Sequence, residues 1–170
     1  MKDNDLVLYM DSSIRIKTGK LHPILDAVSV TGLLSQFIGL KLLCYTNPKM
    51  FEWFHEKDSV YNNMDTIEAN FLIMEKNFIN SLIMKAWITC ALDENCISPE
   101  GSRISPCCGC HRFDQDALTI ISTYFYGHPS TDSVLRLPAY SFTKNESYFF
   151  DVRRHEGLPY FENNNEIISH

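Results

Sequence analysis

Continuous apolar runs and helically spaced apolar residues divide this chain into candidate strands and candidate helices. Apolar runs of about four to eight residues are typical of buried strands. We predict strands over 6–10, 40–45, 69–74, 134–137 and 148–152. The first run stops at Asp11-Ser12-Ser13. We expect it to belong to a mainly parallel sheet, in which the carboxyl ends of the strands face ligands.

The helices are predicted from apolar residues that recur every three or four positions. The pattern is clearest over 77–92, and it returns over 114–126. A proline near the first turn predicts the start of a helix over 22–34, and 50–54 is expected to form a short helical turn. Residues 93–110 are rich in Pro, Gly, Ser and Cys, which predicts a loop.

The composition is that of one globular domain. The chain has 170 residues, of which 45% are hydrophobic, and we place the domain at 1–160 with a polar tail over 161–170. With 21 acidic and 15 basic side chains the formal charge is −6, and no run of Lys or Arg is suited to tracking phosphates. Nucleic acid is therefore not an expected partner. The apolar stretches are also interrupted before they reach the length that spans a bilayer.

The cysteines point to an oxidising compartment. Five of them are bunched within 21 residues, namely Cys90, Cys96, Cys107, Cys108 and Cys110. This density predicts disulfides, with the pairing left open. Cys44 stands apart in an apolar run, where we expect a buried free thiol. Asn145-Glu146-Ser147 is an acceptor sequence for N-glycosylation, which takes place in the secretory lumen.

The amino terminus, Met-Lys-Asp-Asn-Asp, lacks the features of a signal peptide. Two explanations remain open. Either the chain is part of a longer protein whose N-terminal anchor directs it into the secretory pathway, or it is cytosolic and its cysteines are reduced or bind zinc. We expect the first, because the Cys-Cys-Gly-Cys-His run over 107–111 lacks the two separated ligand pairs of a structural zinc site.

Asp11 is the first candidate for chemistry. A carboxylate at the end of a strand can hold a divalent cation that neutralises a diphosphate. Such sites usually have a second acid with one residue between the two, and here that position is Ser13. The alternative is that Asp11 caps the turn that follows the strand.

The second candidate is the polar cluster that precedes the last helix. Asp114, Gln115 and His111 can bind sugar hydroxyls, and Arg112 can approach a phosphate. The alternative is that these residues satisfy free backbone N–H groups where the helix begins. The aromatic residues, among them Trp87, are expected in the core rather than against a sugar ring.

Five segments carry a resemblance to a known family. They are Leu8-Tyr-Met-Asp-Ser-Ser-Ile-Arg15, Ala69-Asn-Phe-Leu-Ile-Met74, Lys85-Ala-Trp-Ile-Thr-Cys-Ala-Leu92, Cys96-Ile-Ser-Pro99 and His111-Arg-Phe-Asp-Gln-Asp-Ala-Leu118. Their order resembles uncharacterised glycosyltransferase-like proteins that are abundant in nematodes and other invertebrates. These are similar in layout to GT-A transferases, including the glycogenin family and the lipopolysaccharide galactosyltransferases. The likeness covers roughly residues 5–130.

The resemblance implies an α/β fold, namely the C-terminal part of a GT-A domain with a mixed sheet flanked by helices and without the N-terminal nucleotide-binding half. Asp11 and Ser13 would take the position of a motif that binds Mn²⁺ and the diphosphate. Asn70 would lie on the strand that contacts the sugar, and Asp114 with Gln115 would be the catalytic pair beside the transferred sugar.

The implied activity is transfer of a hexose from a nucleotide sugar to a glycan or protein acceptor, in the lumen of the Golgi. A non-catalytic lumenal module that binds carbohydrate or another partner is the alternative, and a cytosolic zinc-stabilised protein is a third. The transferase interpretation requires that Asp11 and the Asp114–Gln115 pair converge on one cleft.

Overall fold

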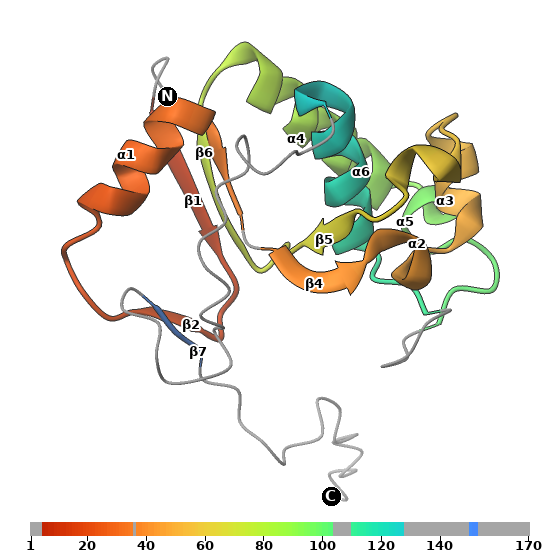
Figure 1. Cartoon of the computed structure of the whole chain (residues 1–170), viewed down its shortest axis with the longest axis horizontal. Helices are drawn as coiled ribbons and strands as arrows, with labels where there is room; N and C mark the ends of the chain where they lie inside the picture. The colour runs from red at the N-terminus through yellow and green to blue at the C-terminus, as the bar shows by residue number, and fades with distance from the viewer. Residues whose placement is uncertain (1–4, 36, 104–109, 128–149, 153–170) are drawn as a thin grey trace, which may run out of the picture.

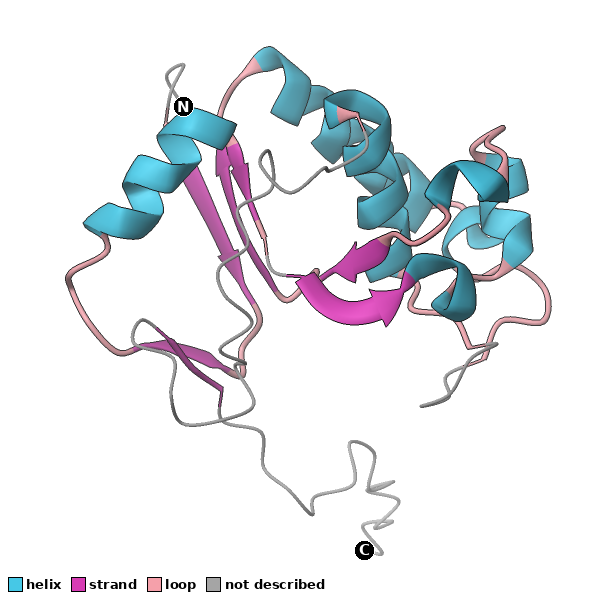
Figure 2. Cartoon of the chain, viewed as in Figure 1, coloured by secondary structure: helices cyan, strands magenta, loops and turns pink. Residues whose placement is uncertain are grey.

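The computed structural model describes residues 5–35, 37–103, 110–127 and 150–152, and it is a mixed α/β protein with small antiparallel sheets (Figures 1 and 2). The strands are β1 (Leu6–Met10), β2 (Ile14–Ile16), β3 (Leu33–Leu34), β4 (Phe37–Lys41), β5 (Asp65–Ile67), β6 (Phe71–Glu75) and β7 (Phe150–Val152). The helices are α1 (His22–Thr31), α2 (Leu42–Tyr45), α3 (Pro48–Trp53), the 3-10 turn η1 (Asp58–Tyr61), α4 (Phe78–Ala91), α5 (Glu94–Ile97) and α6 (Asp114–Tyr126).

The main sheet has the strand order β1-β6-β3, and both outer strands run antiparallel to β6. The other described pairs, β2 with β7 and β4 with β5, are also antiparallel. The prediction of a mainly parallel sheet is therefore wrong for the described strands. Parallel strands are normally covered on both faces. In β1, which is an outer strand of the described sheet, Leu6, Leu8 and Tyr9 are 42%, 40% and 47% exposed.

Helices cover the two faces of the main sheet. α1 lies on one side (Figure 1), where Val28 shares a buried cluster with Phe71 and Ile73. α4 and α6 lie on the other side, and Leu72 and Met74 belong to the buried cluster that these helices form. Successive residues of β6 thus face opposite helix layers, as the two-residue period of a strand requires.

The two helices with the clearest apolar spacing are confirmed. α6 has the predicted bounds, and α4 spans all but the end residues of the predicted helix over 77–92. Asn77 caps α4 by accepting a hydrogen bond from the Asn80 N–H (2.8 Å). The two helices pack together, and the Tyr126 hydroxyl donates to the Asn80 side-chain oxygen (2.7 Å).

The helix predicted over 22–34 ends early. Gly32 adopts a left-handed conformation (φ 71°) that stops α1 at Thr31, and Leu33 and Leu34 form β3 instead. A side chain at position 32 would also meet the Asn77 amide nitrogen at 3.2 Å and the Tyr126 hydroxyl at 3.3 Å. Glycine is thus required here both by the backbone conformation and by close packing.

The prediction of a strand over 40–45 is wrong for most of these residues. β4 ends at Lys41, and Leu42–Tyr45 forms α2. Leu42 is fully buried, and its N–H donates to the carbonyl of Met64 (2.9 Å). A short apolar run is compatible with a buried strand or a buried helical turn, and here a contact with a distant segment stabilises the turn.

Three of the four described cysteines are in disulfides, and they are not the ones that the sequence predicted throughout. Cys90 and Cys96 are bonded to each other, with Cα atoms 5.1 Å apart, and this removes both from any zinc site. Cys44 is disulfide-bonded, so the expectation of a free thiol there is wrong. Cys110, expected in a disulfide, is buried and free. Spacing in the sequence does not decide pairing, because a disulfide requires Cα atoms within about 7 Å.

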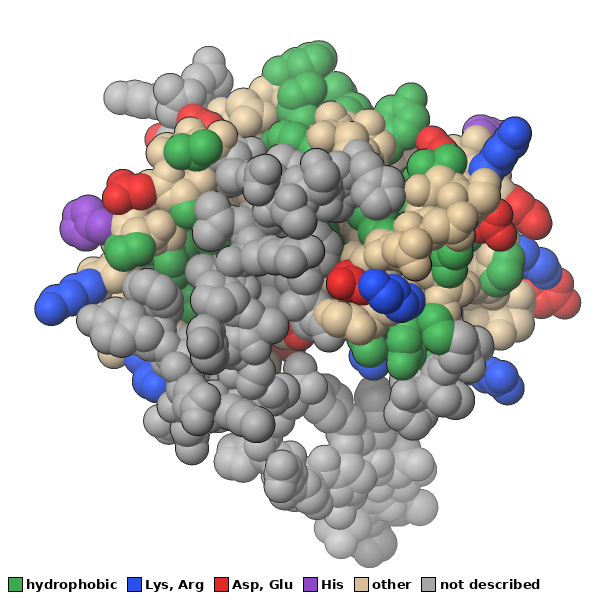
Figure 3. Space-filling view, viewed as in Figure 1, with side chains coloured by type: hydrophobic (Ala, Val, Ile, Leu, Met, Phe, Trp, Pro, Cys, Tyr) green, Lys and Arg blue, Asp and Glu red, His purple; other side chains and the backbone are tan. Residues whose placement is uncertain are grey.

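Several predicted features lie outside the described residues. They are Cys107, Cys108, the sequon at Asn145, the strand over 134–137 and the tail over 161–170. Within the described part of the chain, no helix combines the length and the apolar character needed to cross a membrane. On the face shown in Figure 3, the described Lys and Arg side chains are scattered, and hydrophobic side chains gather along the upper edge.

Candidate functional site

The end of β1 and the start of β6 bring Asp11 and Asn70 together. The Asp11 N–H donates to the Asn70 carbonyl (2.7 Å), which extends the β1–β6 ladder one pair beyond Met10 and Phe71. Residues directly opposite each other in an antiparallel pair point to the same face of the sheet. The side chains of Asp11 and Asn70 therefore share a face.

This face is the one that α4 and α6 cover. Asp11 shares it with Tyr9, because residues two apart on a strand point the same way. The Tyr9 ring contacts the ring of Trp87 on α4 edge to face, with centroids 6.4 Å apart and an angle of 84° between the ring planes. The strand thus carries an aromatic ring and a carboxylate toward the same pair of helices.

Asp114 joins these residues from the first turn of α6. The Trp87 indole N–H donates to the Asp114 carbonyl (2.9 Å), which ties α4 to the start of α6. The Asp114 side chain is exposed. Nevertheless, the protein atoms around its carboxylate displace water and raise its pKa, and the negative charge of Asp11 raises the pKa further. Asp11 and Asp114 are therefore within electrostatic reach of each other.

We call Tyr9, Asp11, Asn70, Trp87 and Asp114 the acidic-aromatic site. One atom in it lacks a hydrogen bond: the side-chain oxygen of Asn70 is buried and has no partner among the described residues. A buried acceptor without a donor costs about 1–3 kcal/mol.

The predicted Mn²⁺ position is occupied by a turn. One carboxylate oxygen of Asp11 accepts a hydrogen bond from the Ser12 N–H (2.8 Å), and the other accepts from the Ser13 hydroxyl (3.4 Å). This is the turn-capping arrangement that the sequence left open. Among the described residues, no group of three or more His, Cys, Asp or Glu side chains is placed to hold a metal ion. These residues do not fit a metal site built by the protein, and we derive no step through a metal.

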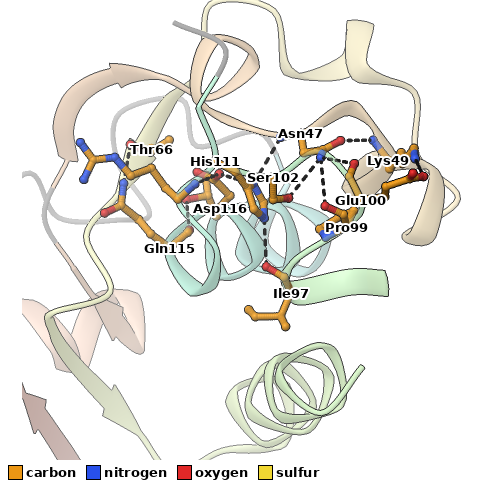
Figure 4. Close-up of polar contacts among 12 residues, drawn as sticks. Asn47, Lys49, Thr66, Ile97, Pro99, Glu100, Ser102, His111, Gln115 and Asp116 are labelled. Atoms are coloured by element: carbon orange, nitrogen blue, oxygen red, sulfur yellow. Dashed lines mark hydrogen bonds and ion pairs between the residues drawn. The ribbon is translucent and has the colours of Figure 1, made fainter. Parts of the chain in front are cut away.

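His111 belongs to a separate polar cluster (Figure 4) and is only 1% exposed. Its Nε2 lies 3.0 Å from the Ile97 carbonyl and therefore carries a hydrogen, because a carbonyl only accepts. Its Nδ1 accepts from the Asn47 N–H (3.3 Å) and lies 3.2 Å from Oδ2 of Asp116. These contacts join the start of α6 to the segments around α3 and α5.

Asp116 is the buried acid of this cluster, with no exposed surface. Burial raises the pKa of Asp116, against the opposing effects of His111 and of the hydrogen bond from the Arg112 N–H (2.8 Å). Asp116 and His111 thus have a structural explanation, namely that they hold the residues before α6 in place. His111 also borders a cavity of about 420 Å³, and Thr46 and Ser102 line the same cavity.

Arg112 and Gln115 make their described contacts with the protein. The Arg112 guanidinium lies 5.9 Å from the ring centroid of Tyr45, and its buried Nε has no hydrogen-bond partner among the described residues. The Gln115 amide donates to the hydroxyl of Thr66 on β5 (3.1 Å; Figure 4). Whether either residue binds substrate stays a prediction.

The structure therefore brings together some of the predicted site residues and separates others. Asp11, Ser13, Asn70 and Asp114 belong to one region, whereas His111 is enclosed in its own cluster. Sequence reasoning missed two members of the site. Tyr9 shares the two-residue period with Asp11, which was a usable signal. Trp87 was expected in the core, and it is partly buried and packs against the larger buried cluster.

Comparisons with protein-family models, with curated proteins and with solved structures found no match for this chain.

Proposed function

We propose that this chain binds a hexose at the acidic-aromatic site, as the sugar-binding part of a glycosyltransferase-like enzyme of GT-A layout. The observation that carries this proposal is a set of contacts: the Asp11 N–H bonds the Asn70 carbonyl just beyond β1 and β6, and Trp87 contacts both Tyr9 and the Asp114 carbonyl. Two carboxylates and an amide are the groups that sugar hydroxyls pair with, since carboxylates accept hydrogen bonds and an amide both donates and accepts.

Asp114 has the character of a general base. Its raised pKa makes the carboxylate a better proton acceptor than an ordinary aspartate. In the proposed reaction an acceptor hydroxyl attacks the anomeric carbon of the bound hexose, its proton passes to Asp114, and the nucleoside diphosphate leaves with the electron pair of the broken bond. The protein atoms that displace water from Asp114 raise its pKa most, the charge of Asp11 adds to this effect, and Asp11 pairs with a sugar hydroxyl.

The diphosphate of the donor is expected to lie away from the two acids, which would repel it. Arg112 is the candidate for a phosphate contact, because guanidinium groups bind phosphate oxygens strongly. Gln115 and His111 would then support α6 rather than touch the sugar.

We place the protein in the secretory pathway, in the Golgi lumen. The support for this is the Cys90–Cys96 disulfide, because disulfides persist in oxidising compartments.

A carbohydrate-binding module without transfer activity is the second candidate. It is favoured by the hydrogen bonds that occupy both carboxylate oxygens of Asp11, since an acid engaged in a turn is less available for catalysis. Both candidates share the sugar site and differ only in turnover.

The experiment measures binding and hydrolysis of UDP-glucose, UDP-galactose and GDP-mannose by the full chain, with Mn²⁺ and with EDTA. Saturation-transfer NMR reports binding, and release of free hexose reports turnover. Asp114→Asn should reduce turnover at least tenfold, while Asp26→Asn, which removes an exposed carboxylate from α1, should leave it unchanged.

Binding of a sugar donor with loss of turnover in Asp114→Asn supports the transferase. Sugar binding without measurable turnover supports the module instead. If neither a donor nor the corresponding free hexose binds, or if folded Asp114→Asn turns over at the wild-type rate, the assignment of the site is wrong.

A further inference from the structure

We infer that the acceptor of the proposed reaction is a saccharide and that its pyranose ring lies on the ring of Tyr9. This inference rests on the proposed function, because it takes the acidic-aromatic site as the place of transfer. It goes further by choosing a glycan over a protein as the acceptor and by assigning Tyr9 as a binding residue.

Tyr9 is exposed although its orientation is constrained. It is 47% exposed, and the edge-to-face contact with Trp87 holds one part of its ring. Trp87 is itself held by the hydrogen bond from its indole N–H to the Asp114 carbonyl. A ring that is already oriented loses little entropy when a ligand packs on it, which favours binding.

The neighbours of Tyr9 match the two sides of a sugar. A pyranose presents C–H groups on its faces and hydroxyl groups around its edge. The Tyr9 ring supplies an apolar surface for a face. Asp11, two residues along the same strand face, and Asp114, within electrostatic reach of Asp11, supply acceptors for the hydroxyls.

A peptide acceptor fits these groups less well. A serine or threonine side chain offers a single hydroxyl and a small apolar area, so it would use one carboxylate and leave most of the Tyr9 ring in water. A pyranose covers the exposed ring of Tyr9 with one face and presents several hydroxyls to the two carboxylates.

The two tryptophans provide a reporter and an internal control. The Trp87 indole N–H is bonded to Asp114, inside the site, whereas the Trp53 indole N–H is bonded to the Asp93 carboxylate (2.9 Å). In ¹H–¹⁵N spectra each indole gives its own signal. Methyl β-D-galactopyranoside or methyl β-D-glucopyranoside should shift the Trp87 signal with saturation and leave the Trp53 signal in place.

The variants separate a binding role from a structural one. Tyr9→Phe keeps the ring and should bind the glycosides within about twofold of wild type, while Tyr9→Ala should bind at least about tenfold more weakly. Leu8→Ala is the matched control, because Leu8 is 40% exposed on the opposite face of the same strand, and it should bind normally. Tyr9→Leu replaces Tyr9→Ala if the Trp53 signal shows that the alanine variant is misfolded.

The inference fails if neither glycoside shifts the Trp87 signal, or if Tyr9→Ala binds the glycosides as tightly as wild type does. It also fails if a blocked peptide that contains serine and threonine shifts the Trp87 signal and the glycosides do not. These outcomes are independent of donor hydrolysis. Turnover that depends on Asp114 without glycoside binding at Tyr9 overturns this inference alone. Glycoside binding without donor turnover overturns the transferase function, and with it the acceptor role, and leaves Tyr9 as a saccharide-binding residue of the module.

Discussion

Asp114, in the first turn of α6, has a pKa that is raised first by the protein atoms that displace water from its carboxylate and further by the negative charge of Asp11, just after β1. The two residues are far apart in the sequence. They meet because Asp11 continues the β1–β6 ladder on the face that α4 and α6 cover, and because the Trp87 indole holds the start of α6 over that face. The transferase interpretation requires the two acids to lie near each other, and their interaction can be tested by measurement.

Removing the charge of Asp11 should lower the pKa of Asp114. In wild type the pKa of Asp114 should lie above its ordinary value of 3.8, and in Asp11→Asn it should move back toward that value. The measurement is a ¹³C NMR titration of the side-chain carboxyl carbons. Asp26→Asn, which removes a charge from α1, should leave the pKa of Asp114 unchanged. An equal pKa in wild type and Asp11→Asn would show that the two acids do not interact.

Asn80 should be one of the most sensitive polar positions. Its side-chain nitrogen donates to the carbonyls of Gly32 (2.7 Å) and Glu75 (2.8 Å), and its oxygen accepts from Tyr126 (2.7 Å). Asn80→Ala leaves these buried groups unpaired and should lower the free energy of unfolding by roughly 3 kcal/mol.

Two further variants should lose less stability than Asn80→Ala. Tyr126→Phe removes one of the three hydrogen bonds and should cost about 1 kcal/mol, and the exposed Asn62→Ala should cost less than about 0.5 kcal/mol. Urea unfolding followed by circular dichroism gives all three values. Equal stability of Asn80→Ala and Asn62→Ala would contradict the bridging role of Asn80.

The Cys90–Cys96 disulfide should stabilise the end of α4. Non-reducing peptide mapping should recover this linkage and should find Cys44 in a disulfide. Cys110 is buried and free, so it should react with an alkylating agent only after the protein is unfolded. Cys90→Ser with Cys96→Ser should lower the free energy of unfolding by roughly 2 kcal/mol, as expected for a short loop. Alkylation of Cys90 in non-reduced, unfolded protein would rule the linkage out.

Asp116 should make stability depend on pH in a defined direction. Its folded-state pKa lies above its ordinary value of 3.8, so the folded protein binds the proton more tightly than the unfolded chain does. This contribution to stability is fully present below about pH 4 and is lost as the pH rises through the folded-state pKa. Relative to Asp116→Asn, wild type should therefore lose stability as the pH rises above 4.

Thermal unfolding of both proteins between about pH 3 and pH 7 tests this expectation. A stability difference that does not change with pH, or that changes in the opposite direction, would show that Asp116 is ionised at little cost despite its burial. Asp26→Asn, which removes an exposed carboxylate from α1, serves as the control here too.

The sequence by itself determined the elements whose signals are local. The apolar spacing of α4 and α6, the buried strand β6 and the acid at the end of β1 were all visible in it, because helix and strand periods depend on neighbouring residues. It also indicated that cysteines would form disulfides. It did not show that the Asn80 side chain on α4 bonds the carbonyl of Gly32 at the end of α1, since a contact between distant residues leaves no local pattern in the sequence.

Only the tertiary structure decided the direction of the strands, the helical form of Leu42–Tyr45, the pairing of Cys90 with Cys96 and the place of Trp87 beside Asp114. The physical reason is the same in each case. These features depend on which distant segments pack together, and an apolar run or a cysteine cluster is compatible with several packings. The interaction between Asp11 and Asp114 exists because one packing was selected.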